Sequence, residues 1–198
     1  MATRTQAPKI DRGRVAAAVR ELLLALGENP SRAELRETPE RVAELYAEIF
    51  SGIGADPVDE LADSLEEGHT GLVMLRDIPF HSMCEHHLLP FSGVAHVAYL
   101  PDKRIVGLGK LARVVQACAR RPQLQERLTT DIAETLERGL QPRAVAVVVE
   151  ASHLCVAMRG VKIEGTSVLT TAMRGRYATS PEERTEVLTL LSRGGLPE

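Results

Sequence analysis

The sequence S-M-C-E-H-H at residues 82–87 decides how the rest of this chain must be arranged, because its side chains need partners from elsewhere. It brings one thiol, Cys84, and two imidazoles, His86 and His87, into one turn's length of chain. Thiolate sulfur and neutral imidazole nitrogen are the ligands that Zn²⁺ prefers in proteins. The C-x-x-H spacing lets one tight turn present Cys84 and His87 to a single ion. We therefore predict half of a metal site here.

The other half is predicted in the sequence H-L-C at residues 153–155. Side chains two residues apart on a strand share a face, so we expect His153 and Cys155 on one strand face. Structural zinc takes four protein ligands, whereas catalytic zinc takes three and leaves a position for water. If three of the five candidate residues bind the metal, two histidines remain beside it for proton transfer. Each residue alone is more typical of an ordinary core or surface position, so the prediction depends on the combination.

The composition is that of a globular protein with a substantial core. The chain has 198 residues, of which 44% are hydrophobic and 26% charged, so we expect one domain with a helical appendage. A net charge of −3, 3% aromatic residues and no tryptophan argue against nucleic-acid and membrane partners. No apolar stretch reaches the roughly 20 residues that a membrane helix needs. Three cysteines do not make a disulfide framework, and we predict a cytoplasmic protein.

The first third of the chain has helical periodicity. Residues 1–10 are expected to form a flexible tail, and residues 11–70 a helical region with helices over 12–26 and 39–50. Thr38 is the expected N-cap of the second helix, with Pro39 in its first turn. The acidic stretch 56–68 is expected to be a loop with a short helical piece.

Residues 71–198 are predicted to form a catalytic domain built on a sheet. Strands are expected over 72–81, 91–100, 143–158 and 166–173, and helices over 110–119, 123–139 and 181–192. The fold class is therefore α+β. Four strands do not easily close a barrel alone, and open sheet edges favour pairing with another subunit.

Several polar residues outside the two metal segments are candidates for binding a ligand. Lys110 and Arg113 are three apart at a predicted helix start, where backbone N–H groups favour phosphate. A solvated basic helix face explains this pair slightly better from sequence alone. Glu126 follows Gln125, and a carboxylate can accept the two parallel N–H groups of guanine, although most helical glutamates are simply solvated. Arg159 and Arg41 would add two further guanidinium groups.

Three stretches together resemble the GTP cyclohydrolase I family: residues 82–87, the sequence R-P-Q-L-Q-E-R-L-T at 121–129, and H-L-C-V-A-M-R-G at 153–160. The likeness extends from about residue 38 to the C-terminus, and the order and spacing of the motifs agree. It implies the tunnelling fold, in which each subunit gives an antiparallel four-stranded sheet and two helices, and the sheets of several subunits join into a barrel. The usual assembly of the family is a homodecamer, a dimer of pentamers, with active sites between subunits.

The resemblance also implies an activity and a role for each matching residue. The family converts GTP and water into 7,8-dihydroneopterin triphosphate and formate, the first step of folate or tetrahydropterin biosynthesis. It uses Zn²⁺ to activate the water that attacks C8 of guanine. Carried over to this chain, the zinc ligands are Cys84, His87 and Cys155, and the proton-transfer groups are His86 and His153. The guanine edge is assigned to Glu126 with Gln125, and the triphosphate to Lys110, Arg113, Arg159 and, from a neighbouring subunit, Arg41.

One position departs from the family pattern, which usually has serine immediately before the lysine that matches Lys110. This chain has Gly109, so the hydroxyl that contacts the ribose–phosphate region is missing. A specialised paralogue therefore stays open, one that acts on another guanine nucleotide or stops at a ring-opened intermediate.

Of two readings outside the main one, only the first stays open. The first is a noncatalytic, zinc-stabilised interaction protein, which needs a fourth protein ligand. The second is a relative of the nitrile reductase of queuosine synthesis, which uses a catalytic cysteine without this zinc set. The intact trio of Cys84, His87 and Cys155 argues against it.

Overall fold

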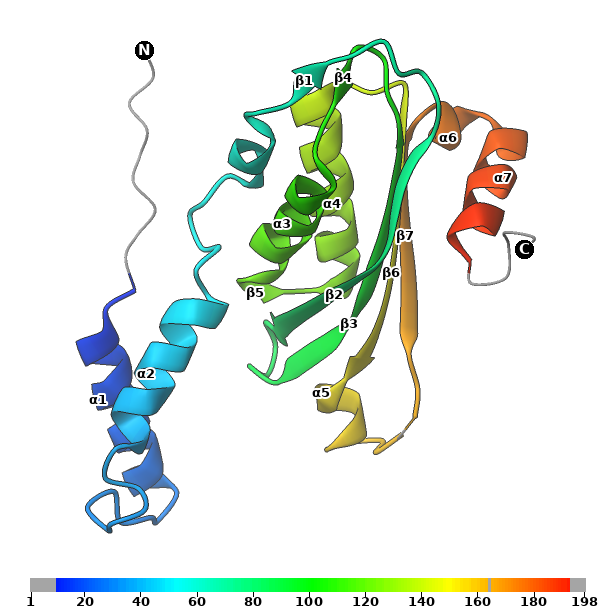
Figure 1. Cartoon of the computed structure of the whole chain (residues 1–198). Helices are drawn as coiled ribbons and strands as arrows, with labels where there is room; N and C mark the ends of the chain where they lie inside the picture. The colour runs from blue at the N-terminus through cyan, green and yellow to red at the C-terminus, as the bar shows by residue number, and fades with distance from the viewer. Residues whose placement is uncertain (1–9, 164, 193–198) are drawn as a thin grey trace. The chain divides into compact units, whose positions relative to one another are not determined.

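The computed structural model describes residues 10–163 and 165–192 and divides them between two compact units (Figure 1). The boundary lies between Ala55 and Asp56. Almost all of the expected tail, residues 1–9, lies outside the described part of the chain. None of the described helices combines the length and the hydrophobicity that a membrane span needs.

The N-terminal unit is a pair of helices, α1 (Arg12–Ala25) and α2 (Thr38–Ile49), packed against each other. The Asp11 carboxylate caps α1 by accepting a hydrogen bond from the Arg14 N–H at 3.0 Å. Both helices lie where the periodicity predicted them. The expected N-cap role of Thr38 is wrong, because Thr38 is already the first helical residue and Glu37 precedes the helix without a side-chain cap.

The second unit is built on an antiparallel sheet whose strands follow the order β5-β2-β3-β6-β7. Its long strands are β2 (Val73–Cys84), β3 (Pro90–Leu100), β6 (Ala144–His153) and β7 (Val168–Gly175). The two-residue strand β5 (Pro122–Gln123) pairs in parallel with the end of β2. A separate small sheet joins β1 (Leu65–Glu66) to β4 (Arg104–Ile105).

Helices cover both faces of this sheet (Figure 1). One face carries α3 (Leu108–Ala119) and α4 (Gln125–Leu140), and the other carries α7 (Pro181–Leu191), preceded by the short α6 (Arg176–Thr179). Val147 in β6 packs toward α3 and α4, whereas its neighbour Val148 belongs to the cluster under α7. Because both faces are buried, the apolar run at 145–149 is continuous rather than alternating. Four long antiparallel strands with two helices on one face confirm the expected α+β class and the tunnelling fold.

The segment that links the two units in sequence belongs to the second one. The 3₁₀ helix η1 (Pro57–Leu61) packs against α3 and α4 and buries Leu61 in the core. The contact is close at Gly139 of α4, where an added Cβ would lie 2.4 Å from Leu61 Cδ1 and would force this side chain to shift. Residues 56–70, which sequence grouped with the N-terminal helices, are therefore part of the packed sheet unit in this structure.

Two strand ends differ from the sequence prediction, and both matter for the metal segments. Strand β2 extends to Cys84, so this cysteine is the last strand residue rather than part of a connection. Strand β6 ends at His153, and the one-turn helix α5 (Leu154–Ala157) follows at once. The expectation of a strand through residue 158 is therefore wrong. The Met158 N–H closes the helical turn on the Leu154 carbonyl at 2.8 Å.

Candidate metal centre and nucleotide site

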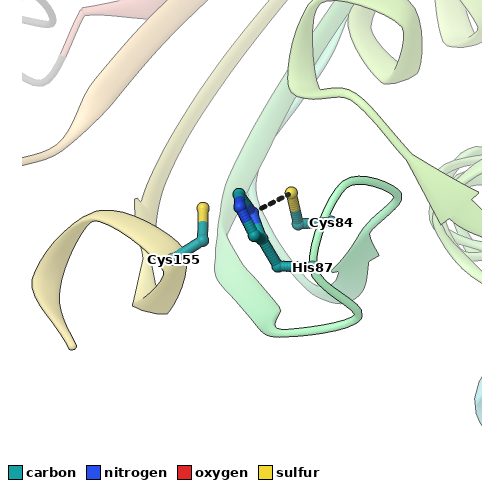
Figure 2. Close-up of side chains that lie close together, drawn as sticks. All are labelled: Cys84, His87 and Cys155. Atoms are coloured by element: carbon teal, nitrogen blue, oxygen red, sulfur yellow. Dashed lines mark hydrogen bonds between the residues drawn. The ribbon is translucent and has the colours of Figure 1, made fainter. Parts of the chain in front are cut away.

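The two cysteine–histidine segments meet at one place in the sheet unit. One ligand atom each from Cys84, His87 and Cys155 lies within 4.8 Å of the other two (Figure 2). The Cys84 Sγ and His87 Nδ1 atoms are 3.9 Å apart. Tetrahedral zinc, with Zn–S near 2.3 Å and Zn–N near 2.0 Å, places neighbouring ligand atoms roughly 3.5–3.8 Å apart. The donor set and its spacing therefore fit a zinc ion.

The turn that carries Cys84 and His87 is fixed by its own backbone and by two salt-bridged side chains. The Cys84 N–H donates to the Leu89 carbonyl at 2.9 Å, and the Leu88 N–H donates back to the Cys84 carbonyl at 2.8 Å. The Glu85 carboxylate accepts two hydrogen bonds from the Arg127 guanidinium of α4, at 2.5 and 3.1 Å. These bonds from Arg127 lower the pKa of Glu85. The metal-binding turn is thus anchored to α4.

Cys155 reaches the centre from α5 and not from a strand. The prediction that His153 and Cys155 share one strand face is wrong, because the chain turns helical directly after His153. Figure 2 shows the Cys155 side chain directed from this turn toward Cys84 and His87. Burial, then hydrogen bonding to the Cys84 thiol and its charge, raises the pKa of Cys155. Two thiolates this close need a cation between them, which is a second reason that the site fits a metal.

The two remaining histidines stand outside the ligand group. Among the described residues, no fourth histidine, cysteine or carboxylate joins the triad. His86 is exposed, with its ring centroid 6.1 Å from that of His87. The His153 ring stacks on Phe91 at a centroid distance of 4.7 Å and an interplanar angle of 2°. Burial lowers the pKa of His153, against a smaller opposing effect of Glu126, and this favours the neutral ring near pH 7.

The two residues predicted to hold guanine lie in different environments. Glu126, in the first turn of α4, is exposed, and its carboxylate can accept hydrogen bonds from a ligand. Gln125 is only 2% exposed, and its amide hydrogen-bonds within the protein. Its Oε1 atom lies 2.7 Å from His153 Nε2. The family resemblance assigned both residues to guanine, but burial separates them.

The predicted phosphate-binding residues are paired with acids or with the metal turn. Lys110 Nζ lies 2.7 Å from Asp63 Oδ2, and this hydrogen bond lowers the pKa of Asp63. Arg113 Nε lies 3.2 Å from Glu60 Oε2. Further contacts join Arg159 to His87 and, in the separate N-terminal unit, Arg41 to Glu37 at 2.5 Å. The sequence marked the stretch 56–68 as acidic but carried no signal for pairing across so many residues.

Comparison with known proteins gives matches along most of the chain. The sequence profile of the family described as GTP cyclohydrolase I matches residues 15–192. A protein named GTP cyclohydrolase 1 from Rhodopirellula baltica is 55% identical over 185 residues, which cover 93% of this chain and 81% of that protein. A protein of the same name from Dehalococcoides mccartyi is 53% identical over 177 residues, covering 88% and 94%. One from Streptococcus thermophilus is 54% identical over 179 residues, covering 90% and 96%.

Among solved structures, the apo archaeosine synthase QueF-Like superposes with a TM-score of 0.41. It is 20% identical, and the match covers 55% of this chain and 97% of that chain.

Proposed function

This chain belongs to the GTP cyclohydrolase I family, and on that premise we propose that Cys84, His87 and Cys155 bind Zn²⁺ at the centre of its active site. The enzyme converts GTP and water into 7,8-dihydroneopterin triphosphate and formate. The observation that carries the zinc assignment is the convergence of three ligand atoms within 4.8 Å, from two segments far apart in sequence. A closed structural site would need a fourth ligand, and the described residues supply none to this group.

The chemistry removes C8 of the guanine base as formate. Both C–N bonds to C8 are hydrolysed, each with one water, and one water is lost again when the pterin ring closes, so the net consumption is one water. The zinc ion, when bound, supplies a water of lowered pKa for attack at C8. Each bond cleavage also needs a proton delivered to the departing nitrogen.

His153 and His86 are the proposed proton-transfer groups. His153 is fixed by its stacking on Phe91, and its lowered pKa keeps the ring neutral and able to accept a proton near pH 7. His86 stands on the metal turn next to the ligand His87, where an exposed imidazole can deliver or receive a proton in solution. Two bases of different exposure suit a reaction that needs proton transfer in both directions.

The nucleotide is held by charge at both ends. The exposed carboxylate of Glu126 accepts the parallel N–H groups on the guanine edge. The triphosphate is neutralised by a set of cations, namely Lys110, Arg113, Arg159 and, from a neighbouring subunit, Arg41. Lys110 and Arg113 lie in the first two turns of α3, where the helix N-terminus also favours an anion.

A homodecamer of two pentamers, with active sites between subunits, is part of the proposal. Among the described strands, β7 pairs only with β6 and so presents a free edge to a second sheet. Leu169 at the start of this edge strand is 62% exposed, which supports burial against another copy of the chain. A cytoplasmic location would keep the ligand thiols reduced, and all three cysteines are free.

The test is to incubate zinc-loaded protein with GTP, resolve the products by mass spectrometry and assay formate. We expect dihydroneopterin triphosphate and formate in equal amounts. Accumulation of a ring-opened formyl nucleotide would instead support the alternative of an arrested, specialised paralogue, for which Gly109 is the specific observation. Unchanged GTP in the presence of stoichiometric zinc would overturn the proposed reaction.

A further inference from the structure

Gln125 is a buried amide whose four hydrogen bonds join three elements. It is the first residue of α4 and is 2% exposed. Its Nε2 atom lies 3.1 Å from the Val149 carbonyl oxygen of β6, and 2.8 Å from the Val168 carbonyl oxygen of β7. A third acceptor, Thr170 Oγ1, is 3.1 Å away. On the other side, the Oε1 atom lies 2.7 Å from His153 Nε2.

These neighbours fix the orientation of the Gln125 amide. Two of the three atoms around Nε2 are backbone carbonyl oxygens, which can only accept hydrogen bonds. Rotating the amide by half a turn would place Oε1 against both carbonyls and leave three buried oxygens facing one another. Only one orientation satisfies the site, with the NH₂ group toward β6 and β7 and Oε1 toward His153.

A chain of hydroxyl groups supports the same orientation. Thr129 Oγ1 donates to the Gln125 backbone carbonyl at 2.7 Å, and it lies 2.6 Å from Thr170 Oγ1. The Thr170 hydroxyl therefore donates its hydrogen to Thr129, which leaves an oxygen lone pair for the Gln125 NH₂ group. Every donor in this network has an acceptor.

The orientation of the amide determines which nitrogen of His153 carries the proton. Since Gln125 Oε1 can only accept, the His153 Nε2 atom must donate and so carries the hydrogen. The neutral ring then has its lone pair on Nδ1. Among the described residues, no hydrogen-bond partner faces this Nδ1 atom. Stacking on Phe91 at 4.7 Å holds the plane of the ring.

We propose that Gln125 is a positioning residue that locks His153 in the Nε2-protonated tautomer, so that Nδ1 is the atom that exchanges protons during catalysis. The inference rests on the proposed role of His153 and replaces the expected contact between Gln125 and guanine. Consecutive helical residues project about 100° apart, which allows α4 to direct Gln125 into the core while Glu126 stays exposed to the substrate. The start of α4 thus serves the reaction in two ways: Glu126 binds guanine, and Gln125 positions His153.

The direct test reads the tautomer in the resting, zinc-loaded enzyme without any substrate. Protein labelled with ¹⁵N only in histidine would be sedimented and measured by magic-angle-spinning NMR, a method that tolerates a large assembly. The His153 signals are assigned by their loss in His153→Asn. We expect a protonated Nε2 and an unprotonated Nδ1 for His153. A proton on Nδ1 would overturn the proposal, whatever reaction the enzyme catalyses.

Two matched variants then connect the tautomer to the rate. Gln125→Met removes the acceptor, and we expect mixed His153 tautomers with kcat lowered about 10²-fold while KM for GTP changes by less than about threefold. Gln123→Met makes the same change at a glutamine that is fully buried and whose amide is bonded to Cys118 and Asp131 instead of His153. It should keep the wild-type tautomer.

The outcome that contradicts the proposal is specific. If Gln125→Met raises KM for GTP strongly while the His153 tautomer stays as in the wild type, Gln125 acts on the nucleotide. If Gln125→Met does not fold, the NMR spectrum of the wild-type enzyme still shows which nitrogen of His153 carries the proton. Inactivity of the wild-type enzyme on GTP would remove the proposed reaction but leave the measured tautomer in place, so the two failures are distinguishable.

Discussion

The Lys110 ammonium group lies 2.7 Å from the Asp63 carboxylate, although 47 residues separate them in sequence. A second pair of the same kind, Arg113 with Glu60 at 3.2 Å, lies beside it. Both acids belong to the segment around η1, and both bases are proposed ligands of the GTP triphosphate. A bound triphosphate must therefore compete with carboxylates of the same chain for these two cations.

We predict that Asp63→Asn lowers KM for GTP by about two- to fivefold, because the triphosphate then no longer competes with this carboxylate for Lys110 and an exposed ion pair is weak. The effect should shrink as ionic strength rises, since Asp63 is exposed and screening weakens its attraction to Lys110. Steady-state kinetics at low and high salt measure both. Glu134→Gln is the matched control, because it also removes one exposed acid, from a pair with Arg174 at 3.1 Å. An equal drop in KM in the control would show that net charge alone is responsible.

His86→Ala should keep a full complement of zinc and lose turnover. His86 lies outside the ligand triad, so its removal leaves the three metal contacts intact. Loss of a general acid–base group lowers kcat by about 10²- to 10⁴-fold. Metal analysis of the purified variant, together with formate release, tests both parts. Loss of the zinc along with activity would indicate a fourth protein ligand and favour the noncatalytic reading.

Cys155→Ser should abolish both metal and activity. A serine hydroxyl is a poor zinc ligand at neutral pH, and only Cys84 and His87 would remain to hold the ion. Cys118→Ala is the control, because this thiol is fully buried in the core and is not part of the triad. Metal content by mass spectrometry separates the two. An active, metal-free Cys155→Ser enzyme would contradict the zinc mechanism.

Cys118 should resist alkylation under conditions that modify the partly exposed ligand Cys155. Burial raises the pKa of Cys118 to about 12, so at pH 8 only about one thiol in 10⁴ is the reactive thiolate. After chelation of the zinc in the native protein, iodoacetamide should label the partly exposed Cys155 but not Cys118. With zinc bound, all three should be protected. Peptide mapping reads each site, and labelling of Cys118 in folded protein would show that its environment opens.

The two metal segments could be predicted from the residues because their candidate ligands stand in short, local patterns, whereas the choice of Cys84, His87 and Cys155 among five candidates came from the family resemblance. Cys84 and His87 lie three residues apart, and the chain has only three cysteines, so few other groupings of metal ligands are available. The route by which Cys155 reaches them could not be predicted. The residues after His153 are as apolar as the strand before it, so the sequence pattern predicted that the strand continues. In the structure the chain turns into α5 instead, which brings Cys155 to its partners.

The buried role of Gln125 was also out of reach of sequence reasoning. Gln125 and Glu126 are both polar residues at a helix start, and nothing local distinguishes a core amide from an exposed carboxylate. The acceptors that decide the matter, in β6 and β7, lie 24 and 43 residues further along the chain. Only the packing of α4 against the sheet brings them to the amide. The same limit hid the pairing of Lys110 with Asp63.

Gly109→Ser should strengthen the use of GTP and stabilise α3 slightly. A Cβ at Gly109 meets no atom within 4 Å, so the serine that the family usually has at this position fits without strain. Serine in place of glycine near a helix start stabilises the helix by a few tenths of a kcal/mol, and its hydroxyl can reach an anion at the N-terminus of α3. We expect KM for GTP to fall about two- to fivefold, the effect of one added hydrogen bond. Gly107→Ser adds the same hydroxyl at the N-cap, also in open space, and should improve stability without changing KM. Equal kinetics for all three proteins would mean that position 109 does not contact the nucleotide.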